Sequence, residues 1–328
     1  MNQLKKYLLP LLLLLVLVSL TACGSTGEDQ TEKEGSESSE KASEETKEAD
    51  FPITVTDALG NEVTIEEQPE SIVSLIPSNT EITYALGMGD AVVGVTDFDN
   101  YPEEVAEVEK IGGMEFNVEK IISLQPDVVL AHASGAHNSE AGLKQLQDAG
   151  INVIVVKDAT SIDGAYDSIN FIGQVTGTTE KADEIVNNMK ERLGNIEEKA
   201  ATISEEDKKN VWVEISGAPE IYTAGKGTFI DEMIQAVGAI NVAADLEGWP
   251  KVTEEDAVLF NPDIIVLTYG YYTENALEKV LGRDAWKDVP AIQEEQVYDI
   301  HSDKVTRPGP RLIEGVEELA KAIYPDVY

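Results

Sequence analysis

The chain has 328 residues and carries 62 acidic against 24 basic side chains, a formal net charge of −38 at pH 7. This excess of negative charge excludes nucleic acid and anionic membrane surfaces as direct partners, because both are bound through basic patches. Cys23 is the only cysteine, which excludes an internal disulfide.

The first 22 residues have the pattern of an export signal. Lys5 and Lys6 precede an apolar run over residues 8–20, which is short for a membrane span but suits the core of a signal peptide. Residues 20–24 (LTACG) resemble the lipobox of bacterial lipoproteins. This resemblance implies a signal peptide over residues 1–22 and diacylation of Cys23. Two acyl chains would anchor the protein stably at the extracellular face of the cell membrane.

Residues 23–50 are predicted to form a disordered acidic linker. They contain almost no apolar side chains, so burial cannot offset the entropy that ordering would cost. Lys5 and Lys6 contribute +2 and residues 23–50 contribute −7, which leaves about −33 for residues 51–328.

Residues 51–160 alternate short β-branched runs with amphipathic stretches. This alternation predicts an N-terminal α/β lobe built on a mostly parallel, doubly wound sheet. Pro126 and Gly150 mark the ends of two of its helices. The expected strands cover residues 72–76, 91–95, 128–131 and 152–156, and the expected helices cover residues 79–86, 118–124 and 143–149.

Residues 161–201 contain no strand candidate. Apolar side chains recur there at helical spacing, which predicts a long interlobe helix that Gly177 is placed to break. The β/α alternation then resumes and predicts a C-terminal α/β lobe over residues 202–328. Its expected strands cover residues 211–215, 264–267 and 296–300, and its expected helices cover residues 229–237 and 312–323.

An internal repeat supports two similar lobes. Glu119 precedes Pro126 by seven residues, and Glu255 precedes Pro262 by the same seven. An aspartate and an apolar strand follow each proline. Such a repeat on both sides of a long helix predicts two Rossmann-like α/β lobes with a ligand cleft between them.

Motifs for catalysis or metal binding are weak. The chain has no Gly-x-Ser-x-Gly elbow, and residues 225–228 lack the spacing of a phosphate-binding loop. His301, Ser302 and Asp303 are consecutive, and such neighbours rarely converge as a triad. The three histidines fall short of a zinc cluster. Neither a metal nor a cofactor is expected, and an enzyme that uses His301 and Asp303 stays as an alternative.

A group of ring-bearing side chains falls in loops and at strand ends. Ligands of doubly wound sheets bind beyond the carboxyl ends of the strands, and Tyr and Trp offer apolar faces with a polar edge. The group comprises Phe98, Tyr101, His132, Tyr222, Trp249, Tyr269, Tyr271, Tyr272 and His301.

Motifs spread over residues 51–325 resemble class III solute-binding proteins of ABC importers, the family that carries vitamin B12 and iron-siderophores. The resemblance implies a long rigid helix between the lobes, small closure motions and no catalysis. We expect a monomer that passes a small molecule to permease subunits. The motifs are residues 76–87, 99–102, 117–121, 126–127, 158–161, 222–226, 249–250, 262–263 and 307–311.

The resemblance also implies roles for single residues. Glu119 and Glu255 match the two glutamates that dock such proteins onto permease arginines. Within the family the vitamin B12-binding branch is the most similar. Gly113 or Met114 falls where that branch has a tryptophan, so one wall of its site is absent or rebuilt here. The candidate ligand-binding residues are Phe98, Tyr101, His132, Tyr222, Trp249, Asp303 and Arg307.

Three ligands remain open. A corrinoid such as vitamin B12 leads, held by stacking and hydrogen bonds in the cleft. A ferric siderophore is the second, because Arg307 and Arg311 flank a Pro-Gly-Pro turn and anionic complexes favour basic pockets. Haem is the third, with His132 or His301 as the iron ligand.

Overall fold

The computed structural model describes residues 51–328. The predicted signal peptide over residues 1–22, the acidic linker over residues 23–50 and Cys23 lie outside the described residues. In the described part, no helix combines the length and the apolar character that crossing a bilayer requires.

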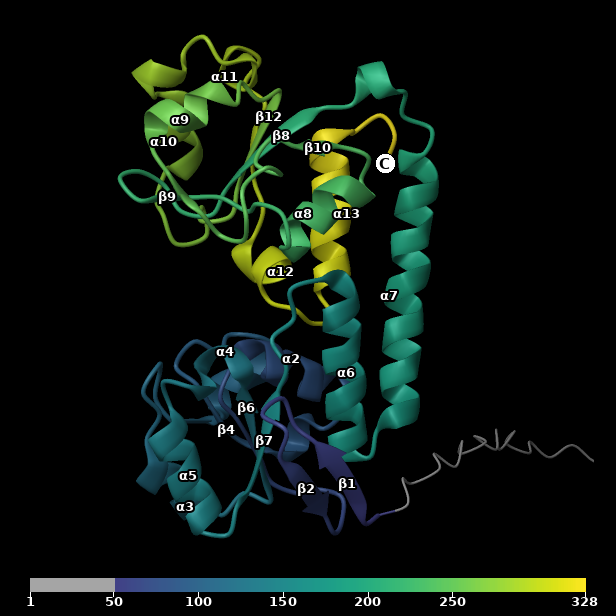
Figure 1. Cartoon of the computed structure of the whole chain (residues 1–328), viewed down its shortest axis with the longest axis vertical. Helices are drawn as coiled ribbons and strands as arrows, with labels where there is room; N and C mark the ends of the chain where they lie inside the picture. The colour runs from purple at the N-terminus through teal and green to yellow at the C-terminus, as the bar shows by residue number, and fades with distance from the viewer. Residues whose placement is uncertain (1–50) are drawn as a thin grey trace, which may run out of the picture. The chain divides into compact units, whose positions relative to one another are not determined.

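The N-terminal lobe is built on a five-stranded parallel sheet with the order β5-β4-β3-β6-β7. Helices lie on its faces, as the alternating pattern predicts (Figure 1). Helix α2 begins two residues before the prediction, because Pro77 takes the first helical position. The strands are β3 (Ile72–Ser74), β4 (Val92–Val95), β5 (Glu109–Lys110), β6 (Val128–His132) and β7 (Asn152–Val156), and the helices are α2 (Pro77–Ala85), α3 (Val118–Leu124), α4 (Ala133–Ala136) and α5 (Glu140–Asp148).

The C-terminal lobe repeats this plan with a four-stranded parallel sheet of order β10-β8-β12-β13. A short antiparallel pair, β9 (Ile221–Tyr222) with β11 (Lys251–Val252), is added to this lobe. The strands are β8 (Asn210–Glu214), β10 (Ile240–Asn241), β12 (Ile264–Leu267) and β13 (Val297–Asp299), and the helices are α8 (Phe229–Ala236), α9 (Glu254–Leu259), α10 (Ala276–Leu281), α11 (Pro290–Gln293), α12 (Ser302–Thr306) and α13 (Leu312–Ile323).

The segment between the lobes is two helices rather than one. Helix α6 (Ile162–Thr176) ends at Gly177, which adopts a left-handed conformation with φ 71°, and α7 (Thr179–Ala200) runs back beside it (Figure 1). Glycine adopts this left-handed conformation at the lowest cost, because it has no Cβ atom. Both helices contribute to the connection: α6 packs against α2 and β7 of the N-terminal lobe and against α8 of the C-terminal lobe, and α7 packs against α6, α8 and α13.

The internal repeat has a structural basis. After α3, Asp127 accepts hydrogen bonds from the backbone of Glu70 and Ser71, at the start of β3. After α9, Asp263 accepts from the backbone N–H of Asn210, at the start of β8. In each lobe the aspartate therefore fixes the register of two neighbouring parallel strands.

One hydrophobic core runs through both lobes. It joins side chains of α6 and α7 to those of α2 in the N-terminal lobe and of α8 and α13 in the C-terminal lobe. The antiparallel hairpin of β1 (Ile53–Thr56) and β2 (Glu62–Ile65) also packs here through Val55 and Ile65. Each sheet has a second, separate core on its other face. The lobes therefore share buried apolar surface.

Candidate functional site

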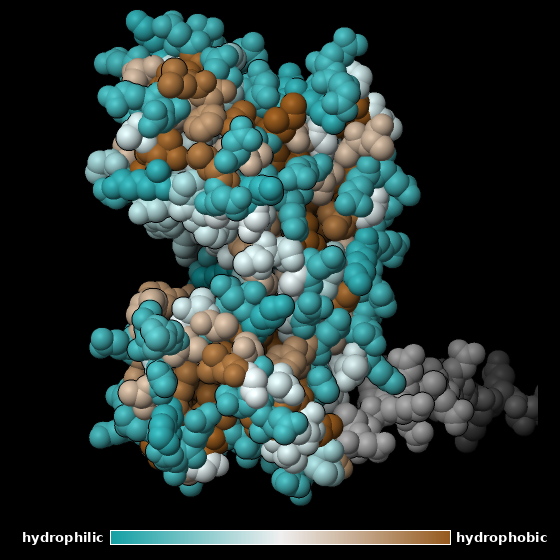
Figure 2. Space-filling view, viewed as in Figure 1, coloured by the Kyte–Doolittle hydropathy of each residue, from teal (hydrophilic) through white to brown (hydrophobic). Residues whose placement is uncertain are grey.

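A cleft separates the two lobes on the side away from α7 (Figure 2). It contains a cavity of about 290 Å³ whose walls come from both lobes. The N-terminal wall follows the ends of strands β3, β6 and β7, which is where parallel sheets present ligand sites. The principal lining residues are Ile76, Ser78, His132 and Asp158 from the N-terminal lobe and Thr228, Phe229, Trp249 and Thr306 from the C-terminal lobe.

A second cavity of about 160 Å³ opens within the N-terminal lobe. Phe98, Met114 and Phe116 line it together with His132, which therefore borders both cavities. Phe98 is 52% exposed and Met114 is 80% exposed. Two large apolar side chains left open to solvent beside a cavity are typical of a surface that a ligand covers.

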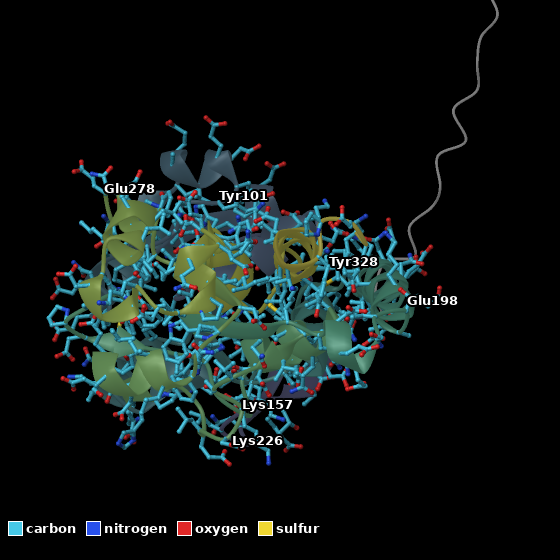
Figure 3. All side chains as sticks on the ribbon, turned by 90° about the horizontal axis from the view of Figure 1, so that it is seen from above. Tyr101, Lys157, Glu198, Lys226, Glu278 and Tyr328 are labelled. Atoms are coloured by element: carbon cyan, nitrogen blue, oxygen red, sulfur yellow. The ribbon has the colours of Figure 1, made fainter. Side chains whose placement is uncertain are left out.

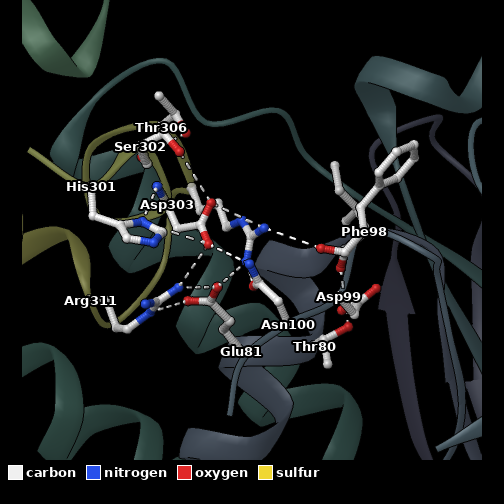
Figure 4. Close-up of polar contacts among 12 residues, drawn as sticks. Thr80, Glu81, Phe98, Asp99, Asn100, His301, Ser302, Asp303, Thr306 and Arg311 are labelled. Atoms are coloured by element: carbon white, nitrogen blue, oxygen red, sulfur yellow. Dashed lines mark hydrogen bonds and ion pairs between the residues drawn. The ribbon is translucent and has the colours of Figure 1, made fainter. Parts of the chain in front are cut away.

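Charged side chains tie the lobes together beside the cleft (Figure 4). Glu81 on α2 is only 3% exposed. It forms ion pairs with two arginines of the C-terminal lobe. Arg311 donates to both carboxylate oxygens at 2.8 and 2.6 Å, and Arg307 donates to one at 2.8 Å. A buried carboxylate requires such compensation, because an unpaired buried charge is strongly unfavourable.

Asp303 and Asn100 complete this group. The guanidinium of Arg307 lies 3.2 Å from Asp303, and the amide nitrogen of Asn100 donates to Asp303 at 2.9 Å. Arg307 also donates to the side-chain oxygen of Asn100 and to the backbone oxygen of Phe98. We call Glu81, Asn100, Asp303, Arg307 and Arg311 the interlobe cluster. Its two carboxylates balance its two guanidinium groups, so it brings no net charge to the cleft.

His132 is a neutral hydrogen-bond donor toward the cleft. Burial lowers the pKa of His132 below its usual value of 6.5, and the nearby Asp158 carboxylate opposes this only in part. The backbone N–H of Ser134 donates to Nδ1 at 3.4 Å, and the Ser134 hydroxyl lies 2.8 Å from the same nitrogen. In the tautomer in which Nδ1 accepts both contacts, the proton is on Nε2, which lies 4.0 Å from an Asp158 oxygen.

Hydrogen bonds between Thr96 and Asp99 fix the loop that contains Phe98. Asp99 accepts hydrogen bonds from the backbone N–H and the hydroxyl of Thr96, at 2.8 and 2.5 Å. Burial raises the pKa of Asp99, and the Thr80 and Thr96 side chains oppose the rise. These contacts fix the backbone on both sides of Phe98.

Two rings of the C-terminal lobe, outside both cavities, pack in a tilted arrangement with 42° between their planes. The rings of Tyr271 and His301 lie 4.2 Å apart between centroids. Near the start of the loop that contains Tyr271, the fully buried Glu214 accepts two hydrogen bonds from Arg283 and one from the hydroxyl of Tyr269. Burial and the Glu214 carboxylate raise the pKa of Tyr269. This network fixes the start of the loop that carries Tyr271.

The candidate ligand-binding residues divide into three groups. Phe98, His132 and Trp249 line the cavities. Asp303 and Arg307 belong to the interlobe cluster, as described above. Tyr101 lies under the guanidinium of Arg311, 3.9 Å from its ring centroid, while Tyr222 lies on β9 and lines neither cavity.

The run His301-Ser302-Asp303 and the possible metal-binding side chains have no arrangement that suggests catalysis or metal binding in residues 51–328. His301 caps α12 by accepting from the backbone N–H of Asp303, so the His-Ser-Asp run forms a helix start. Within residues 51–328, no group of three His, Cys, Asp or Glu side chains is placed to hold a metal. Ser78 and Asp158 lie within two of the family-like motifs, residues 76–87 and 158–161, but are not among the predicted ligand-binding residues. Ser78 follows β3, and Asp158 follows β7.

Glu119 and Glu255 occupy equivalent places in the two lobes. Each is exposed in the first turn of its helix, α3 or α9. Both helices lie on the side of the molecule where the cleft opens (Figures 1 and 2). Carboxylates there also gain from the positive end of the helix dipole.

Comparisons with known proteins agree with this architecture. Residues 72–304 match the sequence profile of the periplasmic binding protein family. The uncharacterized ABC transporter substrate-binding lipoprotein YvrC of Bacillus subtilis is 54% identical over 278 residues, which cover 85% of this chain and 87% of that protein. A cobalamin-binding protein of Halobacterium salinarum is 30% identical over 282 residues, which cover 84% of this chain and 74% of that protein.

A solved structure shares both sequence and fold. The crystal structure of a possible iron-binding, periplasmic solute-binding protein of Staphylococcus epidermidis is 37% identical, with a TM-score of 0.70, and the match covers 79% of this chain and all of that one. These proteins bind and carry solutes and are not enzymes. The chain therefore belongs to the periplasmic binding protein family, as a substrate-binding protein of ABC transporters of the vitamin B12, siderophore and haem type.

Proposed function

We propose that the protein captures a corrinoid in the interlobe cleft and delivers it to the permease subunits of an ABC importer. It would work as a monomer, held at the extracellular face of the cell membrane by acyl chains on Cys23. Glu119 and Glu255 would dock it onto the permease. The corrinoid is cargo, and the protein itself needs no cofactor.

The charge balance of the interlobe cluster is the observation that favours a corrinoid as the ligand. Anionic ferric siderophores are best held by unpaired guanidinium groups. Arg307 and Arg311 are instead paired with Glu81 and Asp303. Three exposed side chains at the two cavities, Phe98, Met114 and Trp249, are apolar or aromatic, as a broad ligand without strong charge requires. The 30% identity with a cobalamin-binding protein adds support.

A ferric siderophore remains the second candidate. Lys157 and Lys226, one from each lobe, are both exposed and lie at the same edge of the molecule, opposite Tyr101 (Figure 3). Two lysines on one flank of the cleft would attract an anionic complex. The similarity to a possible iron-binding protein favours the same reading. Haem would instead require His132 or His301 at its iron.

Ligand titration tests the proposal. Trp249 borders the cavity, whereas Trp212 and Trp286 are fully buried elsewhere. Cyanocobalamin and cobinamide should therefore change the tryptophan fluorescence of the purified protein. Trp249→Phe should remove most of that change, while equilibrium dialysis still detects binding. Tight binding of a ferric siderophore or haem, with no response to either corrinoid, would reject the corrinoid assignment.

A further inference from the structure

The part of the cavity beside the first turn of α2 has an arrangement of polar groups that the functions above leave unused. Ser78, at the second position of α2, lines the cavity and is 3% exposed. Its hydroxyl has no hydrogen-bond partner among residues 51–328. A buried hydroxyl without a partner is costly, and because Ser78 is one of the residues that line this cavity, a ligand group seated against it would supply the missing partner.

The start of α2 adds a further donor at the same place. Pro77 has no N–H, and no side chain caps this helix. The first N–H groups of a helix have no partner within it. The N–H group of Ser78 therefore supplements its hydroxyl, and the helix dipole makes this end partly positive.

His132 and Asp158 stand across from one another in the same cavity. The Nε2 atom of His132 is a donor, and the Asp158 carboxylate is an acceptor. Their separation of 4.0 Å is too long for a direct hydrogen bond. Each is therefore free to bond to a third group. The cavity thus presents donors at the α2 start and at His132, and a carboxylate acceptor at Asp158.

We propose that this subsite binds a primary carboxamide of the ligand, an inference that rests on the proposed function. The amide oxygen would accept from the hydroxyl and N–H of Ser78 and from His132, and the amide NH₂ would donate to Asp158. A ligand carboxylate would meet the Asp158 charge, and a ligand ammonium would meet the positive end of α2. Corrinoids carry primary carboxamide side chains around the macrocycle, so the subsite selects a group that they possess.

The test compares cyanocobalamin with its monocarboxylates, in which one peripheral amide is hydrolysed to the acid. The wild-type protein should bind at least one of these isomers tenfold or more weakly than cyanocobalamin. Asp158→Asn removes the charge and should reduce that discrimination to about threefold or less. Asp167→Asn, an exposed carboxylate on α6 outside the cavity, should leave it unchanged.

Ser78→Ala separates a ligand contact from a structural role. We expect cyanocobalamin to bind about five- to tenfold more weakly, with no fall in the Tm of the free protein, because the hydroxyl has no protein partner to lose. Equal binding of all isomers by the wild type, unchanged discrimination in Asp158→Asn, or a lower Tm without weaker binding in Ser78→Ala would reject the subsite alone. If no corrinoid bound the wild-type protein, the proposed function and the subsite would fall together.

Discussion

Glu81 is the residue on which the contact between the lobes most depends. It is buried and balances two guanidinium groups that are themselves mostly buried. Glu81→Gln would leave Asp303 as the one carboxylate facing two guanidinium groups, so one buried positive charge would be uncompensated. We expect this to lower the free energy of unfolding by about 3–5 kcal/mol. Urea unfolding followed by circular dichroism measures this loss.

The matched control for Glu81 is Glu317, which pairs with Arg192 while both side chains are one-third exposed. Solvent-screened pairs contribute little, so Glu317→Gln should cost about 1 kcal/mol or less. Equal losses in the two variants would contradict the role given to the interlobe cluster.

His132 is expected to make stability depend on pH. Burial lowers its pKa in the folded protein, so below about pH 6.5 the unfolded chain takes up the proton more readily. The His132 contribution to stability is therefore present above that pH and is lost as the pH falls toward the folded-state pKa. His132→Gln removes this dependence.

The measurement is the free energy of unfolding of wild type and His132→Gln at pH 7.5 and pH 5.5. The wild type should lose more stability between the two than the variant does. His137→Gln, which changes an exposed histidine, serves as the control and should follow the wild type. Identical pH profiles for wild type and His132→Gln would contradict the prediction.

At the scale of elements, the turn between α6 and α7 depends on close approach. A Cβ atom added at Gly173 would lie 2.5 Å from the Cβ of Ala182, across the two helices. Gly173→Ala should therefore push the helices apart and cost about 1–3 kcal/mol.

Gly194, in contrast to Gly173, has room for a larger side chain. It lies within α7, and an added Cβ would meet nothing within 4 Å. Gly194→Ala should stabilise the protein by about 0.5–1 kcal/mol through helix propensity alone. Thermal unfolding of both variants tests the pair, and changes of the same sign would refute the argument.

The elements themselves were largely predictable from the sequence. Helix α3 and strands β7 and β12 have the predicted bounds, because local periodicity and terminating Pro or Gly residues define them. The interlobe cluster was not predictable. Glu81 and Arg307 are 226 positions apart, so no local pattern reveals their pairing. Short helices such as α12 were missed because five residues cannot display a helical period.

At the scale of the whole molecule, the proposed docking would join the two lobes to one partner. Replacing Glu119 and Glu255 together by alanine should abolish uptake through the importer and leave ligand binding intact, because neither residue lines a cavity. Glu107→Ala with Glu278→Ala removes one exposed glutamate from each lobe elsewhere and should leave uptake unchanged. Transport in proteoliposomes that contain the permease measures both, and normal uptake by the first pair would contradict the docking role.

The interlobe cluster and the shared core have a consequence for competition at the membrane. Because they join the lobes across the cleft, we expect α3 and α9 to keep much the same spacing whether the cleft is full or empty. An importer that recognised only these two helices would accept unloaded carriers as readily as loaded ones. Uptake would then slow when carriers outnumber ligand, and the best transport would require an intermediate number of carriers per importer.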